Sequence, residues 1–508
     1  MRRRIRVAVC VAVWLALAGP TAAQEPGAPA TEFGQGATAT APARGLPINL
    51  ASALQLAQAR AIDVQVAAER INAAAAQLDR ARSRWLPNIY VGADYAYHNG
   101  RLQDVAGNIL TTRKEALMLG AGPSAVFSPS EAILAPLAAR QTVAARVSDL
   151  RAAENDTTLA VADAYFAIQR ARGELAGALE AEALAADLVR RAEKLAAGPA
   201  PPVEANRARA ELARRRQAVE AARERWETAS ADLNRLLRLP ASVLVEPVEP
   251  PDLRVELLDP ATPVDDLIPV ALTTRPELAA QQALVAATLA RLRQERLRPL
   301  VPSVVLRGNA TNPAGNLSTG AFGGGIDGRL EHFGTRNSFD VQVLWELQGL
   351  GFGNRAAVRE QESENRVALL NLFRTQDQVA ADVVQAHAQA SRAANRVKLA
   401  EEGLKEAAET VKTNVEGVSQ PRLVGNNLTL IFRVQEVVAA VQGLDQAYRD
   451  YFGAVADANR AQFRLYRALG HPARCVLDPQ PAARLLAPAC PADPPAGGSD
   501  FAVDRGRP

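Results

Sequence analysis

The apolar residues from 128 to 239 predict two very long helices joined by one turn. Ser128 can cap the first helix, Pro129 takes its first position and Glu131 falls three residues after the cap. The one proline before the turn is Pro136, where a kink or a slightly later start is expected. At about 1.5 Å per residue, the first helix is roughly 100 Å long. A hairpin of that length must bury its apolar stripes against similar helices, so the pattern predicts an assembly.

The hydrophobic period changes before this hairpin. A helical pattern over 48–85 gives way to alternation that predicts strands at about 88–98 and 115–127. Each strand has an apolar face, a polar or small face, and aromatic residues towards its ends. This pattern is typical of an outer-membrane barrel. A strand of a soluble sandwich has a similar apolar face and stays open as the alternative.

The same order of elements returns after a shift of roughly 215 residues. A helix is predicted over 266–298, then strands at about 302–312 and 337–347, and a second long hairpin over 348–469 that turns at Gly417. One period is therefore helix, strand, strand, long helix, turn and helix. The predicted fold class is mainly α with a membrane β-barrel part, built from two tandem repeats.

The pattern divides the chain into six parts. They are an export signal over 1–23, a flexible arm over 24–46, a first repeat over 47–239, a proline-rich acidic connector over 240–263, a second repeat over 264–470, and a tail over 471–508. Four strands per chain cannot close a barrel, because about eight is the minimum and open edges are excluded from lipid. Two copies would supply eight strands and three copies twelve. No segment after the leader is apolar enough for a transmembrane helix.

The N-terminus predicts export. Arg2–Arg4 and Arg6 precede an apolar run, and Thr21-Ala22-Ala23 offers a cleavage site. A short membrane anchor is the alternative, but the apolar run is too short to span. Removal of the four arginines leaves 54 of the 58 basic residues against 55 acidic ones, so charge gives no case for a nucleic-acid partner. The run Arg214–Arg216 is read as a solvated helix face.

Candidate chemistry is sparse. The four histidines have no metal-ligand spacing, no HExxH or GxSxG is present, and Met118 is the only methionine after the leader. The GxGxxG at 323–328 lies between two strand candidates and opens no helix, so it is read as a loop. We expect neither an enzyme nor a cofactor. Cys475 and Cys490 in the tail form either a disulfide or two free thiols.

The chain resembles the TolC family of outer-membrane efflux proteins from Leu46 to Gly470. The matching segments are ALQLAQARAIDVQVA, RSRWLPNIYV, VALTTRPELAAQ, PLVPSVVL, VQVLWELQGLGFGNRAAV and RDYFGAVADANRAQFRLYRALG. Singly they are weak, but their order and twofold repetition are specific. The resemblance implies a homotrimer with a 12-stranded barrel in outer-membrane lipid and a 12-helix tunnel. It also implies a periplasmic adaptor at the tunnel tip and, through it, an inner-membrane pump.

The resemblance also implies docking residues at the tips. Gly198 and Ala208 match the spacing of the family's first turn, with Val203 and Glu204 between them. The second turn carries about five or six extra residues after Gly417. There Arg422 either contributes to docking or lies in a solvated loop.

Polar residues on the small-residue faces of the strands are candidates for the barrel lumen. They are Asn88, Asp94, Arg307, Asn309, Asp340 and Glu346. They either tune selectivity or are ordinary hydrated lumen residues.

The function predicted from the sequence is a passive outer-membrane exit duct of a tripartite efflux or type I secretion-like system in a Gram-negative cell. The alternative is a periplasmic coiled-coil adaptor or scaffold without a pore. Two hairpins, each preceded by a pair of strands, argue against the alternative.

Overall fold

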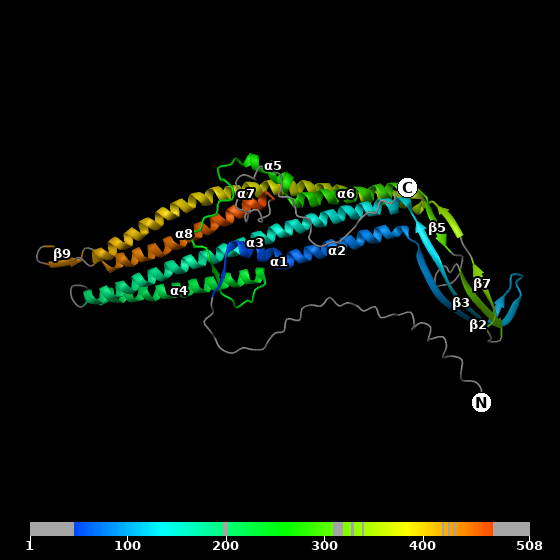
Figure 1. Cartoon of the computed structure of the whole chain (residues 1–508), viewed down its shortest axis with the longest axis horizontal. Coiled ribbons are helices and arrows are strands. Elements are labelled where there is room, and N and C mark those ends of the chain that lie inside the picture. The colour runs from blue at the N-terminus through cyan, green and yellow to red at the C-terminus, as the bar shows by residue number, and fades with distance from the viewer. Residues whose placement is uncertain are drawn as a thin grey trace, which may run out of the picture. The chain divides into compact units, whose positions relative to one another are not determined.

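Two hairpins of long helices account for most of the computed structural model (Figure 1). It describes residues 45–196, 202–307, 319–326, 330–337, 340–418, 421–424, 427–430 and 433–470. The first hairpin pairs α3 (Pro129–Ala196) with α4 (Pro202–Leu237), and the second pairs α7 (Phe352–Val418) with α8 (Val434–Ala468). The 68 residues of α3 form one helix with Pro136 inside it. None of the described helices is long and apolar enough to cross a membrane.

The start of α3 differs from the expected capping box. Ser128 precedes the helix, and its carbonyl accepts the amide of Ala132 at 2.8 Å. Glu131 pairs with Arg84 of the preceding helix–strand junction. Trp85 at that junction packs against Phe127, with ring centroids 4.6 Å apart and the ring planes tilted by 56°. These contacts join the end of the first helical segment to the start of α3.

Each short helical segment before a strand pair is broken once, where the sequence predicted one helix. The first consists of α1 (Leu50–Arg60) and α2 (Ile62–Arg82), followed by the 3₁₀ turn η1 (Ser83–Trp85). The second consists of α5 (Val264–Thr274) and α6 (Pro276–Leu297). Proline disfavours helical geometry at the residue before it, and Arg275, which precedes Pro276, is extended with φ −66° and ψ 122°. The break at Ala61 occupies the equivalent place in the first repeat.

The strands form one sheet at the end of the helices opposite the two hairpin tips (Figure 1). In chain order they are β2 (Asn88–Gln103), β3 (Ile109–Phe127), β5 (Ser303–Arg307), β6 (Thr319–Ile326), β7 (Glu331–Asn337) and β8 (Asp340–Leu344). Both β5 and β6 pair with β3, at Ser124–Phe127 and at Lys114–Ala121 respectively, while β8 pairs with β5 and β7 with β6. The six segments therefore occupy four neighbouring positions in the sheet, which we call strand lines: β2, β3, β5 with β6, and β8 with β7.

Two sequence predictions need correction here. The stretch 319–326, read as a loop, is β6, so the GxGxxG match begins inside a strand. The last strand ends at Leu344 and not at 347, because the chain turns through Gly349, with φ 50°, before α7 begins.

The loop at the second tip also contains the antiparallel strands β9 (Pro421–Val424) and β10 (Asn427–Leu430), and α8 starts only at Val434.

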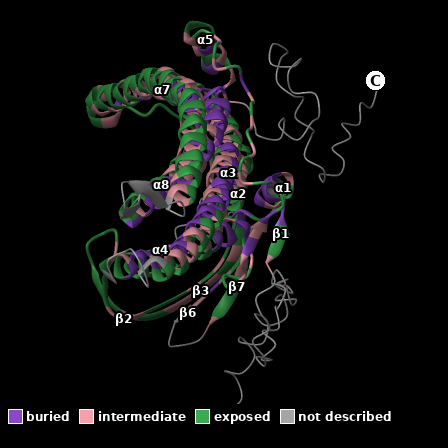
Figure 2. Cartoon of the chain, turned by 90° about the vertical axis from the view of Figure 1, so that its left-hand side faces the viewer, coloured by how far each residue is buried: buried purple, intermediate pink, exposed green. Residues whose placement is uncertain are grey.

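The connector covers one face of the helices at mid-length. A short parallel pair, β1 (Leu46–Ile48) and β4 (Val245–Pro247), packs into a core with Tyr165, Phe166 and Phe463. Further along, Asn459 and Gln462 of α8 hold the connector: the Asn459 Oδ1 accepts the Val255 amide at 2.9 Å, and the Gln462 Oε1 accepts the Leu258 amide at 3.1 Å. Figure 2 shows α1 and β1 on one side of α3.

The predicted leader, arm and tail fall on residues 1–44 and 471–508, outside the described residues. The same holds for Cys475 and Cys490.

Candidate functional site

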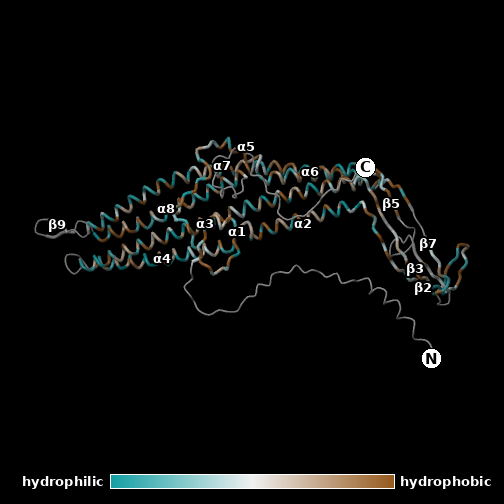
Figure 3. The backbone as a smooth tube through the Cα atoms, viewed as in Figure 1, coloured by the Kyte–Doolittle hydropathy of each residue, from teal (hydrophilic) through white to brown (hydrophobic). Residues whose placement is uncertain are grey.

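One face of the sheet is apolar and exposed. Register pairs Val91 with Ala121 and Tyr95 with Leu117, so these residues share a face. The same face carries Val341 and Val343 at the other side of the sheet. Large side chains on it are exposed: Ile89 at 75%, Val91 at 78%, Tyr95 at 57% and Val341 at 53%. Hydrophobic segments recur along these strands in Figure 3. An apolar exposed sheet face of this extent is typical of a surface that meets lipid or another protein.

At the alternate positions, the backbone register aligns four polar residues, one on each strand line, which we call the polar row. Asn88 pairs with Ser124, Ser124 with Arg307, and Arg307 with Asp340. Three of the predicted lumen residues are therefore brought into one row by register. Ser124 was not among the predicted site residues, although its alternation with apolar neighbours was a usable signal.

The other lumen candidates are placed differently. Asp94 lies six residues further along β2, opposite Met118 on β3. Glu346 lies beyond the end of β8, where it accepts a hydrogen bond from Gln348 at 2.9 Å and faces Arg298 at 3.9 Å. It thus belongs to the strand–helix junction. Asn309 lies outside the described residues.

The sheet and the layer of helices that continues it both end, with no further described strand or helix beside them, on the same two sides. In the described part of the chain, β2 pairs with β3 alone, and β7 and β8 each pair with a single strand. The helices next to the sheet follow the same order, α2, α3, α6, α7, because each leads directly into or out of its strand. One edge of the chain is therefore β2 with α2, and the other is β7 and β8 with α7.

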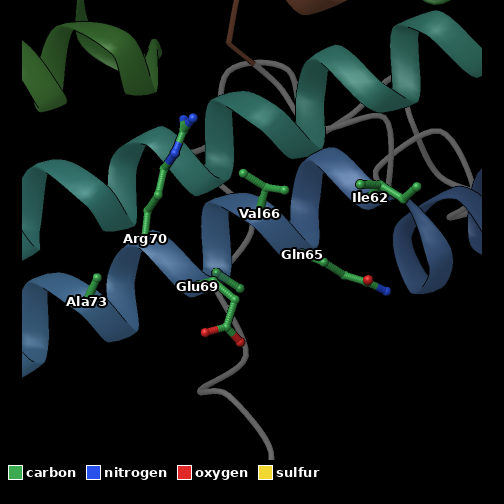
Figure 4. Close-up of a pocket in the computed structure, with 7 residues that line it drawn as sticks. Ile62, Gln65, Val66, Glu69, Arg70 and Ala73 are labelled. Atoms are coloured by element: carbon green, nitrogen blue, oxygen red, sulfur yellow. The ribbon is translucent and has the colours of Figure 1, made fainter. Parts of the chain in front are cut away.

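The α2 edge carries an apolar hollow. A cavity of about 600 Å³ is lined by Ile62, Val66 and Ala73 together with Gln65, Ala68, Glu69 and Arg70. Figure 4 shows Ile62, Val66 and Ala73 along one side of α2 and Glu69 pointing the other way. Ile62 and Val66 are 55% and 43% exposed.

The α7 edge has a matching apolar stripe. Val367, Leu370 and Phe373 are each more than half exposed, at 57%, 64% and 55%. Counted from the sheet end of each helix, Val66 lies roughly 24 Å along α2, and Val367 and Leu370 lie roughly 23 and 27 Å along α7. The two apolar edges are therefore at the same height.

The first hairpin tip combines an exposed and a packed part. Val203 is 49% exposed, whereas Ala208 is fully buried in a cluster with Val411 and Val437 of the second hairpin. Glu204 accepts a hydrogen bond from Arg207 at 2.8 Å, and its Oε2 is buried with no hydrogen-bond partner among the described residues. Ala208 thus sets the packing of the two hairpins, while Val203 faces outward. Gly198 lies outside the described residues.

At the second tip, Gly417 lies in the last turn of α7. Arg422 lies on β9, opposite Thr429 of β10. The residues added at this tip thus form a β-hairpin.

The described residues contain no group of three or more His, Cys, Asp or Glu side chains that could hold a metal ion.

The sequence comparison finds one similar family. Residues 53–237 match the family described as outer membrane efflux protein. This part of the chain is therefore similar to the outer membrane efflux proteins. The matched residues run from within α1 to the end of α4 and include β2 and β3, so the match covers most of the first repeat. A comparison with curated proteins gives no match.

Solved structures of outer-membrane channels share the fold of this chain. VceC of Vibrio cholerae is 15% identical, with 83% of this chain and 96% of that chain covered and a TM-score of 0.65. The CmeC outer membrane channel of Campylobacter jejuni is 15% identical over 83% and 85%, with a TM-score of 0.63. The MtrE outer membrane channel of Neisseria gonorrhoeae is 16% identical over 86% and 94%, with a TM-score of 0.63. The likeness extends over both repeats, beyond the part that the family comparison matches.

Proposed function

We propose that three copies of this chain form an outer-membrane exit duct, a 12-stranded barrel continued by a 12-helix tunnel. The observation that carries the proposal is the pair of open edges, which coincide in sheet and helices. Unpaired strand edges are excluded from lipid, so a sheet with an apolar outer face must close on further copies. Four strand lines per chain give twelve in a trimer.

The contact between copies would be heterologous. Each α2 edge, with Ile62 and Val66, would meet the α7 edge of the next copy, with Leu370 and Phe373. Both edges expose apolar residues at the same height, and a head-to-tail contact of this kind closes into a ring. The apolar sheet face would then meet lipid, and the polar row from Asn88 to Asp340 would repeat around the lumen.

The duct would work without chemistry of its own. After export by its leader, the chain would sit in the outer membrane of a Gram-negative cell with its helices in the periplasm. An adaptor would bind the hairpin tips, where Val203, Glu204 and Arg422 lie, and an inner-membrane pump would supply the energy. The channel fold and the family match support this role. The adaptor alternative does not account for an apolar sheet with open edges.

Cysteine crosslinking tests the trimer. With Cys475 and Cys490 replaced by serine, the variant Val66→Cys/Phe373→Cys is treated in outer membranes with a flexible thiol crosslinker. The expected result is a ladder that ends at the trimer, because each pair joins neighbouring copies.

The control for this test is Val66→Cys/Val248→Cys. Val248 is 65% exposed but lies in the connector, so only monomer is expected. A monomeric product from the Val66–Phe373 pair in a membrane-inserted protein would contradict the proposed interface.

A further inference from the structure

A groove lined by arginines follows α8 on the face turned away from the connector. The connector binds Asn459, and Arg464 lies roughly 140° around the helix from that residue. At this level α8 packs between α3 and α7, so it lies in the middle of the chain and away from both open edges. The groove is therefore neither covered by the connector nor part of the proposed contact between copies.

Two adjoining cavities form the groove. The first, of about 170 Å³, is lined by Gln389 and Arg396 of α7 and by Asp457, Arg460, Ala461 and Arg464 of α8. The second, of about 280 Å³, shares Gln389 and Arg464 with it. A water molecule occupies about 30 Å³ of liquid, so the first cavity alone has room for a carboxylate, phosphate or sulfate group.

Positive charge exceeds negative charge in the first cavity. Arg464 is 3.3 Å from Asp163 of α3, while Arg396 and Arg460 share Asp457 at 3.5 and 3.7 Å. Three guanidinium groups thus face two carboxylates in this cavity, whereas the second cavity is lined by Arg464 and Arg467 together with Asp156 and Asp382. The last two distances exceed the 2.7–2.9 Å of a charge-assisted hydrogen bond. Since a guanidinium has five N–H donors, these arginines keep donors for a ligand.

Arg460 is the most enclosed of the three arginines, with a side chain 19% exposed. Burial lowers its pKa; Asp163 and Asp457 oppose the shift, and Arg170 and Arg464 add to it. An anion in the groove would relieve this repulsion. Arg396 and Arg464 are 59% and 46% exposed, so they are accessible from the open side.

We propose that this groove binds an anionic oxygen group of the transported solute, such as a carboxylate, phosphate or sulfate. The inference rests on the proposed duct, in which the open face of α3 and α8 lines the tunnel and three copies of the groove form a ring. Rings of arginine are the usual way in which pores favour anions.

Ion selectivity of the purified trimer in planar lipid bilayers tests the proposal. In a potassium chloride gradient, Arg464→Gln is expected to raise the K⁺ over Cl⁻ permeability ratio roughly two- to fivefold, since a ring of three positive charges is lost. Inorganic phosphate is expected to reduce the current through the wild-type channel more strongly than through this variant. Arg464→Lys keeps the charge and should keep the permeability ratio.

The matched control is Arg254→Gln. Arg254 is 46% exposed, like Arg464, but lies in the connector and pairs with Glu401 at 2.6 Å. Its replacement should leave the ratio unchanged. Arg396→Gln, at a more exposed position, should shift the ratio in the same direction as Arg464→Gln if the latter folds poorly. Conducting channels with an unchanged ratio in both variants would overturn the anion site alone, whereas a wild-type trimer that never conducts would overturn the duct and the site together.

Discussion

Replacing Gly173 and Gly177 with alanine is expected to destabilise the protein, although alanine is the better helix former. A Cβ atom at Gly173 would lie 2.4 Å from the ring of Phe452, and one at Gly177 would lie 2.6 Å from Tyr448. These glycines are one turn apart on α3, and the two aromatic residues are one turn apart on α8. The glycines therefore form a notch that lets the first hairpin pack closely on the second.

The aromatic residues have little freedom to move away. The rings of Tyr448 and Phe452 are stacked with centroids 6.2 Å apart, and the Tyr448 hydroxyl donates to Glu180 at 2.5 Å. Burial, together with Glu180, raises the pKa of Tyr448 to about 12. Each overlap should lower the free energy of unfolding by about 1–3 kcal/mol. The higher helix propensity of alanine raises it by only about 1 kcal/mol per substitution. We therefore expect a lower midpoint of thermal unfolding, followed by helical circular dichroism.

The matched control is Gly403→Ala/Gly443→Ala. An added Cβ at either of these helical glycines meets nothing within 4 Å, so this variant should be stabilised by about 1 kcal/mol per site. In a Phe452→Ala background, Gly173→Ala should lose its cost. A double glycine variant of α3 as stable as the control would show that the notch does not matter.

The sequence predicted the helical hairpins and four strand lines because their signals are local. The 3.6 and 2.0 periods run for tens of residues in the helices and for several residues in each strand. The breaks at Arg275 and Ala61 were not predicted, although they occupy equivalent places in the two repeats. The resemblance to the efflux family rested on the same repetition, and the family comparison and the solved channel structures confirm it.

The strand β6 was missed because its evidence is not local. Gly323–Gly325 show no alternation and look like a loop in isolation. In the structure β3 and β7 pair with β6 on its two sides. The ring of Phe333 covers Gly323 so closely that a Cβ atom added to this glycine would lie 2.4 Å from it. An aromatic residue on a neighbouring strand thus covers the glycine, a relation that no single window of sequence contains.

The run Arg214–Arg216 shows the same limit for charged residues. It was read as a solvated face, and the two outer arginines are indeed 65% exposed. Arg215 is only 11% exposed and pairs with Glu211 and with Asp445 of α8. Its second partner is 230 residues away in sequence, so the pairing could not be read from the run itself.

Replacing Arg215 with leucine is expected to destabilise the protein more than replacing Arg216 with leucine does. Glu211 and Asp445 are 1% and 3% exposed, and Arg215 contacts both, which joins α4 of the first hairpin to α8 of the second. Leucine would remove the arginine that contacts both carboxylates, and leave Glu211 with Gln442 at 2.8 Å and Asp445 with Arg449 at 2.7 Å. Because each carboxylate keeps a partner, the cost should stay below the roughly 3–5 kcal/mol that follows when a buried ion pair loses one member. We expect a correspondingly lower thermal midpoint and a wider separation of α4 and α8, measured with a spin label on each helix.

The neighbouring Arg216→Leu is the matched control. Arg216 is 65% exposed and lies 3.3 Å from the partly exposed Glu182, so its loss should cost less than about 1 kcal/mol. A triple variant with leucine at 211, 215 and 445 should recover most of the stability, because no buried carboxylate of the cluster would then remain. Equal midpoints for Arg215→Leu and Arg216→Leu would mean that Asp445 and Glu211 reach water when Arg215 is lost, and that the cluster does not hold the two hairpins together.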